Sequence, residues 1–316
     1  MMYITIKINI LIITLLALLG SFMLVLPTSA LEKPNADVQW GCATNERVLS
    51  DTFGCPDNVD IVTGPWLLSG WQAYHTRWID KFDLPVNANK TPYMISYIIA
   101  GKARADQGLQ DCDLSALSIC TDGANYIRQN IASIQDEYRR SFALLAQAHG
   151  DNPVYIHMEP DFYLYHRSSL QKNPLTLSEA HTYMNSFTSI IREQLPQAKI
   201  VMDVSTWNQN LSSWHSGFTN IDYGGVVGKN FNANQNPDGK TYEQVQTQSG
   251  LELIVNTAHT FGGSFNPYNT TWENRNHGVH AVIQPPTNNS AYSTFLATSL
   301  VRVINQTYYP IRTFKQ

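Results

Sequence analysis

Residues 154–163 read VYIHMEPDFY, and the first half of this stretch predicts a strand that is buried on both faces. Its residues are β-branched, aromatic or otherwise apolar apart from one histidine, and Pro160 cannot continue a ladder of backbone hydrogen bonds. Strands that are apolar throughout are typical of a parallel sheet with helices on both faces. The stretch also places two carboxylates, Glu159 and Asp161, at the end of this strand, although only 15% of the residues in the chain are charged.

The segments on either side repeat the pattern of an apolar run followed by an amphipathic helix. Upstream, residues 92–101 (PYMISYIIAG) predict a strand, and residues 125–150 predict a helix because apolar side chains recur every three or four positions. Downstream, Thr176 and Glu179 form a capping-box pattern that predicts the start of a helix, and Pro196 ends it. Strands and helices therefore alternate along this part of the chain.

The same alternation continues toward the C-terminus. The predicted elements are a strand at 199–204, a helix at 208–216, a strand at 222–231, a helix at 239–250, strands at 251–259 and 278–284, and a helix at 290–305. A further helix is predicted near the N-terminus over residues 66–82. Alternating strands and helices form either a closed barrel or an open doubly wound sheet. No GxGxxG or GxxxxGK[ST] turn follows a strand, so we expect an α/β fold, a distorted (β/α) barrel with parallel strands, fewer than or about eight in number, in a TIM-like arrangement.

The first thirty residues differ from the rest of the chain. A lysine precedes a long apolar run, and residues 27–30 (PTSA) have the small side chains of a signal-peptidase site. We expect residues 1–30 to be a secretory signal peptide that is removed, with an uncleaved membrane anchor as the alternative because the apolar run approaches spanning length. Residues 31–316 are then expected to form a single catalytic barrel domain in a secreted or extracytoplasmic location.

The cysteines favour disulfides. Four cysteines, an even number, occur in a chain that we expect to be exported, and their spacing does not match a zinc site. Proximity in the sequence favours pairing Cys42 with Cys55 and Cys112 with Cys120, although four cysteines allow three connectivities.

The composition also limits the kinds of partner. A net charge of −4 without clustered Lys or Arg gives no electrostatic basis for binding nucleic acid or an anionic membrane. Sixteen Tyr and seven Trp suit a protein that handles neutral polar ligands such as sugars. We expect a monomer without a cofactor or metal, with no nucleic-acid partner and no membrane contact after signal removal.

Polar side chains gather where the predicted strands end. In a parallel barrel the ligand site lies at the carboxyl ends of the strands. Carboxylates end two consecutive strands, Glu159 and Asp161 on one and Asp203 on the next. The other residues predicted at these ends include Tyr97, Lys102, Trp207, Asn230 and His259.

This group of carboxylates has a chemical use. Hydrolysis of a glycosidic bond needs a protonated carboxylic acid for the leaving oxygen and a second carboxylate that acts on water or on the sugar. Partial burial and a neighbouring like charge keep one carboxyl protonated. The spacing of Glu159 and Asp161 does not decide which has which role. Either could instead form a salt bridge with Lys102 or Arg104, or cap backbone N–H groups.

His157 lies two residues before Glu159 in the apolar strand. A lone histidine in such a strand is more often a packed core residue than a metal ligand, which is the interpretation that we prefer. A metal-dependent hydrolase that uses His157 is the weaker alternative.

Several short motifs between about residues 92 and 275 resemble, in order, those of glycoside hydrolase family 6, the inverting cellulases and cellobiohydrolases built on a distorted barrel. The Glu-Pro-Asp that ends VYIHMEPD resembles the family's strand-end signature. The resemblance implies that Asp161 is the proton donor and that Glu159 is the preceding acidic residue. KIVMDVSTW resembles the next strand of the family, with Asp203 at its acidic position.

The resemblance extends to residues expected to contact sugar. Trp207 or Trp214 lies in the loop after Asp203, Asn230 lies in the GKNF that ends the following strand, and Trp272 lies in the later NTTW.

Two acidic positions of the family are not matched. Where the family has an aspartate that tunes the proton donor, YIIAGKARAD offers Gly101 and Lys102, with Asp106 as the nearest substitute. The family's late acidic residue, proposed to act as base, has no counterpart, because the chain from Gly278 to its end contains no Asp or Glu. Glu273 is the only late acidic candidate.

The sequence thus predicts a glycoside hydrolase that cleaves a polysaccharide, a β-1,4-linked glucan such as cellulose or a similar glycan, with inversion of the anomeric centre. Asp161 is the expected proton donor, and Glu159 and Asp203 are supporting carboxylates. The expected substrate contacts are Tyr97, Lys102, Trp207, Asn230, His259 and Trp272. Two alternatives stay open: a retaining glycosidase that uses Glu159, and a carbohydrate-binding protein on a degenerate, non-catalytic scaffold.

Overall fold

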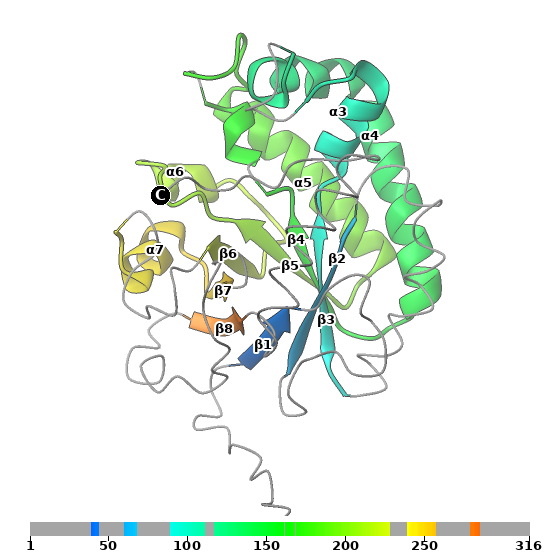
Figure 1. Ribbon diagram of the computed structural model, residues 1–316, viewed down its shortest axis with the longest axis vertical. Coiled ribbons are helices and arrows are strands. Elements are labelled where there is room, and N and C mark those ends of the chain that lie inside the picture. The colour runs from blue at the N-terminus through cyan, green and yellow to red at the C-terminus, as the bar shows by residue number, and fades with distance from the viewer. Residues whose placement is uncertain are drawn as a thin grey trace, which may run out of the picture. The chain divides into compact units, whose positions relative to one another are not determined.

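Eight parallel strands close into a barrel in which each strand pairs with the next along the chain and the last pairs with the first (Figure 1). The strands are β1 (Gln39–Ala43), β2 (Ile61–Leu67), β3 (Thr91–Ser96), β4 (Val154–Met158), β5 (Ala198–Asp203), β6 (Tyr223–Val227), β7 (Leu253–Asn256) and β8 (Val279–Gln284). The predicted parallel barrel is confirmed, and the open sheet is excluded.

This computed structural model describes residues 39–43, 60–67, 89–110, 117–160, 162–167, 169–227, 239–256 and 279–284. All of them belong to the unit Pro34–Gln316, which is separate from the unit Met1–Lys33. The predicted signal peptide and the predicted helix at 290–305 lie outside the described residues. Within these residues, no helix has the length and apolar character needed to cross a membrane.

Among the described residues, helices follow four of the eight strands, β3 to β6. They are α3 (Ile98–Gln107), α4 (Ile119–His149), the 3-10 helix η1 (Phe162–Tyr165), α5 (Leu177–Gln194), α6 (Leu211–His215) and α7 (Tyr242–Ser249). Helix α4 packs against both α3 and α5, and the three lie along the β3–β5 side of the barrel in Figure 1. The capping box predicted at Thr176 and Glu179 starts α5 and is confirmed.

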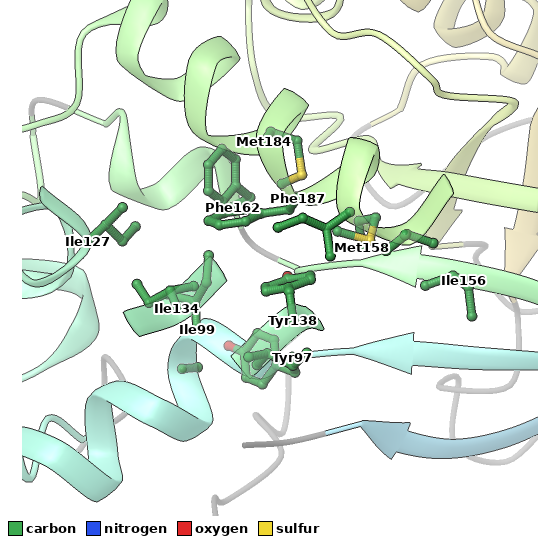
Figure 2. Close-up of a cluster of buried hydrophobic side chains, with 14 of the residues drawn as sticks. Tyr97, Ile99, Ile127, Ile134, Tyr138, Ile156, Met158, Phe162, Met184 and Phe187 are labelled. Carbon is green, nitrogen blue, oxygen red and sulfur yellow. The ribbon is translucent and has the colours of Figure 1, made fainter. Parts of the chain in front are cut away.

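Apolar side chains form one layer inside the barrel and another outside it, because successive residues of a strand point to opposite faces. Tyr93, Ile95 and Tyr155 belong to the inner cluster. Met94 and Ile156, their neighbours along the strands, belong to the outer cluster under the helices. Figure 2 shows part of the outer cluster, whose labelled members are Tyr97, Ile99, Ile127, Ile134, Tyr138, Ile156, Met158, Phe162, Met184 and Phe187.

Two predictions of secondary structure are wrong in part. The strand predicted at 92–101 ends at Ser96, and α3 begins at Ile98. The helix predicted at 66–82 starts inside β2, which runs to Leu67; the rest of that range lies outside the described residues. Both errors come from apolar runs that fit a strand or a helix equally well when read locally.

Candidate functional site

Polar side chains from three neighbouring strands form a row near the carboxyl ends of these strands. Asp203 is the last residue of β5, and its Oδ1 lies 3.5 Å from Nε2 of His157 on β4. Nδ1 of the same imidazole lies 2.9 Å from the hydroxyl of Tyr93 on β3. The second oxygen of Asp203 accepts a hydrogen bond of 3.1 Å from the Ser205 hydroxyl. The carboxylate is 17% exposed and the imidazole 10% exposed, so this row of side chains runs from the barrel end into the buried interior.

Tyr93 is not among the predicted site residues, and His157 is predicted to be a packed core residue. Residues His157 and Asp203 each follow an inner-cluster residue of their own strand, Tyr155 and Val201, by two positions. Because successive side chains of a strand point to opposite faces, this spacing puts both on the inner face. The spacing is therefore the sequence pattern that identifies both residues as facing the barrel interior.

Burial, and then the charge of Asp203, raise the pKa of Tyr93 well above its usual value. Tyr93 therefore stays a neutral hydroxyl that can donate to His157. A second histidine, His215 of α6, is buried, and neither of its ring nitrogens has a hydrogen-bond partner among the described residues. Burial lowers the pKa of His215 to about 4, although the charge of Asp203 acts in the opposite direction, so His215 is neutral at neutral pH.

Gly225 on β6 leaves the space that the imidazole occupies. A Cβ at this position would lie 2.8 Å from Nε2 of His157 and 2.9 Å from its Cε1, closer than real Cβ contacts. Any larger residue would therefore displace His157 from Asp203.

Gly225→Ala is accordingly expected to lower the free energy of unfolding by about 1–3 kcal/mol, as overpacked interiors do. Urea unfolding of the variant and the wild type measures this loss. In a His157→Ala background the added methyl group should cost less, because the clashing ring is gone. Equal costs in the two backgrounds would contradict the assignment of Gly225 as the space for His157.

The side chain of Glu159 points away from this row and toward the helix layer. Glu159 follows β4 with a left-handed φ of 33°, which interrupts the strand's alternation, and its side chain is completely buried. Its Oε1 accepts hydrogen bonds from the backbone N–H of Ile98 at 2.8 Å and of Ile99 at 3.3 Å. The Tyr138 hydroxyl donates a short hydrogen bond to the same oxygen. Glu159 thus caps α3, whose own N-cap residue, Tyr97, provides no capping side chain.

This location confirms the alternative in which Glu159 caps backbone N–H groups. Burial raises the pKa of Glu159 to about 8, while the hydrogen bonds from Tyr138, Ile99 and Ile98 act to lower it. The carboxyl group is therefore mostly protonated at neutral pH. The tyrosine that donates to it lies in the outer apolar cluster and stacks on Phe187 with ring centroids 4.5 Å apart (Figure 2).

Two of the predicted substrate contacts lie elsewhere than expected. Tyr97 is only 8% exposed and packs in the outer cluster (Figure 2). Lys102 is in the middle of α3 and not at a strand end, and it forms an ion pair of 3.0 Å with Asp106. Lys102 therefore does not form the salt bridge with Glu159 that the sequence left open.

Trp207 lies in the loop after β5, close in sequence to Asp203, and is partly exposed. Its ring centroid is 4.8 Å from that of Tyr163 and 4.8 Å from the guanidinium carbon of Arg167. The ammonium of Lys240 donates hydrogen bonds to the carbonyl groups on both sides of the tryptophan, at 2.6 Å to Thr206 and 3.1 Å to Asn208. Tyr163 and Arg167 thus contact the indole beside the end of β5, and Lys240 holds the backbone on both sides of it.

Several predicted site residues lie outside the described residues. They are Asp161, Asn230, His259 and Trp272, together with the late acidic candidate Glu273. In the sequence, Asp161 falls between the end of β4 at Met158 and the start of η1 at Phe162. Its role stays a prediction, as do those of the other four.

The disulfide pairing also stays a prediction. Cys120 is buried at the start of α4 and is disulfide-bonded, and no cysteine among the described residues is free. Its predicted partner Cys112 lies outside the described residues, as does Cys55, and Cys42 belongs to β1. Among the described residues, no group of three or more His, Cys, Asp or Glu residues is arranged to hold a metal ion.

No protein-family model matches the sequence, and no curated protein matches it. The solved structures that resemble this one include the YdhT protein from Bacillus subtilis, at 10% identity over 82% of each chain with a TM-score of 0.52. They also include a GH26 beta-mannanase from Bacteroides ovatus, at 9% identity over 83% of each chain with a TM-score of 0.51. Endo-glycoceramidase II from Rhodococcus sp. aligns over 79% of this chain and 73% of its own at 12% identity, with a TM-score of 0.48.

At these identities the likeness to the YdhT protein and to the mannanase shows the fold alone, a (β/α) barrel. The comparisons give no support for family 6 in particular, so that part of the resemblance is not confirmed.

Proposed function

We propose that this protein is a glycoside hydrolase of the TIM-barrel type that acts on a polysaccharide. The observation that carries the proposal is the partly exposed carboxylate of Asp203 at the carboxyl end of β5 in a closed parallel barrel, with Trp207 four residues further on. Barrel enzymes place their catalytic residues at this end of the strands, and glycosidases use carboxylates there. An indole beside a carboxylate suits the apolar face and the hydroxyl groups of a sugar.

The proposed roles follow from the chemistry of glycosidic bonds. Asp161 donates a proton to the leaving oxygen, and Asp203 is a supporting carboxylate that stabilises positive charge developing on the sugar ring. The reaction inverts the anomeric centre, the substrate is a β-1,4-linked glucan or a similar glycan, and the enzyme is secreted after removal of residues 1–30. The family resemblance of the sequence supports the inversion and the glucan substrate, and the apolar run with the PTSA motif at residues 27–30 supports secretion.

The retaining alternative loses support from the surroundings of Glu159. A general acid or nucleophile must reach the glycosidic bond, whereas this carboxyl group is completely buried and accepts hydrogen bonds from α3 and Tyr138. Glu159 therefore serves the fold in this proposal and takes no part in proton transfer.

A carbohydrate-binding protein remains the second candidate. Its specific support is that, among the described residues that end the strands, Asp203 is the one carboxylate whose side chain is partly exposed. A hydrolase needs two carboxyl groups at the bond, so the proposed reaction depends on Asp161.

Asp161→Asn is expected to reduce the rate of polysaccharide hydrolysis by at least about a hundredfold, because a general acid contributes that much or more. The measurement is the release of reducing ends from a panel of β-1,4-linked and other polysaccharides by the purified protein. Asp151→Asn is the matched control, since Asp151 is exposed and precedes β4 at the opposite end of that strand. The control should retain full activity.

Two results would overturn the proposal. Undiminished hydrolysis by the Asp161 variant would remove this residue from the reaction. Binding of a polysaccharide in calorimetry, without release of reducing ends from any member of the panel, would favour the binding protein. Proton NMR of the first product formed would show inversion or retention at the anomeric carbon.

A further inference from the structure

His157 is a buried polar ring held between two polar groups. The residue is 8% exposed, and its Nε2 forms no hydrogen bond with any of the described residues, although Oδ1 of Asp203 lies 3.5 Å away. Burying a polar nitrogen without a partner costs free energy. If this position served only for packing, an apolar residue would make the folded protein more stable. The gap at Gly225 instead admits an imidazole beside the carboxylate.

The neighbours of the ring select one of its tautomers. Tyr93 is neutral, and its hydroxyl lies 2.9 Å from Nδ1. When this hydroxyl donates to Nδ1, the ring proton must be on Nε2, the nitrogen that faces Asp203. The reverse arrangement would put the Nε2 lone pair against a carboxylate, which is repulsive. The geometry therefore favours the Nε2–H tautomer.

We propose that His157 is a positioning residue for Asp203. Its Nε2–H faces Oδ1, Ser205 holds the other oxygen, and Tyr93 fixes the tautomer from inside the barrel. Together they orient the carboxylate. The separation of 3.5 Å is long for a hydrogen bond, and such contacts commonly shorten when a ligand binds.

This inference rests on the proposed function only for its catalytic consequence. The arrangement of Tyr93, His157 and Asp203 can be tested without a substrate, because imidazole nitrogens report their protonation directly. A failure of the proposed function and a failure of this inference are therefore distinguishable.

The first test is nitrogen NMR of protein labelled with ¹⁵N-histidine, at an alkaline pH where the rings are neutral. The signals of His157 among the nine histidines are assigned by their loss in His157→Gln. We expect the Nε2–H tautomer in the wild type and a rise of the Nδ1–H form in Tyr93→Phe. A predominant Nδ1–H form in the wild type, or an unchanged ratio in Tyr93→Phe, would overturn the proposal.

The second test uses a polysaccharide that the wild type is found to cleave. Tyr93→Phe should lower kcat by about tenfold to a hundredfold with little change in KM, because misplacing a catalytic group has effects of this size. Tyr155→Phe is the matched control, since its hydroxyl lies in the same barrel interior but donates to Gln39. Equal losses in the two variants would contradict a positioning role. His157→Gln, which keeps an amide N–H, should retain more activity than His157→Ala, and equal activities would also contradict the role.

Discussion

Replacing Glu159 with alanine is expected to lower the free energy of unfolding by about 3–5 kcal/mol, among the largest single effects that a substitution produces. The change removes the acceptor of three hydrogen bonds, from the N–H groups of Ile98 and Ile99 and from the Tyr138 hydroxyl. Each buried donor left without a partner costs about 1–3 kcal/mol, and the missing side chain leaves a cavity in a fully buried place. Urea unfolding followed by circular dichroism measures the loss.

Glu159→Gln is the matched control for this substitution. Its amide oxygen can take the place of Oε1, which accepts from all three donors, and its shape is nearly the same. We expect it to retain most of the stability that alanine loses. If glutamine destabilised the protein as much as alanine, or if alanine had little effect, Glu159 would not be the cap that starts α3.

The second large effect is a fall in stability as the pH rises. Burial raises the pKa of Glu159 to about 8 in the folded protein, against a value of 4.5 without burial. Because the folded state binds this proton more tightly than the unfolded state, the contribution is fully present below pH 4.5 and is lost as the pH rises through about 8. At about 1.4 kcal/mol per unit, the loss across this range is on the order of 5 kcal/mol.

Unfolding free energies at several pH values within this window test the prediction. Other groups titrate in the same range, so the quantity of interest is the difference between the wild type and Glu159→Gln. This difference should change with pH in favour of the glutamine variant as the medium becomes more alkaline. Parallel pH profiles would contradict the prediction, because they would mean that the hydrogen bonds to the carboxylate cancel the effect of burial on its pKa.

The fold was predictable from the sequence because its signals are local and repeat. Apolar strands such as VYIHM and the capping box at Thr176 each follow from a few neighbouring residues, and the structure confirms both. The start of α3 was not predictable in this way. Its first N–H groups are capped by Glu159, 61 residues after Ile98, and a local pattern cannot contain a cap that comes from another strand.

The candidate site was only partly predictable for the same reason. Asp203 ends its strand as expected, since an apolar run that stops at an acidic residue is a local pattern. The role of Glu159 depends on a left-handed φ of 33°, which sends its side chain to the helix layer. The role of His157 depends on Tyr93, Gly225 and Asp203, which lie on three other strands and come together only when the barrel forms.

The pairing of β8 with β1 has a consequence for shortened forms of this protein. Residues Gln39 to Cys42 align with Ala281 to Gln284, so the seam joins the first and the last described strands. A chain cleaved or terminated before Val279 would leave β1 and β7 as unpaired edges with free backbone donors and acceptors. Such edges readily pair with other chains, so the loss of this one short segment would turn a self-contained barrel into a species prone to self-association.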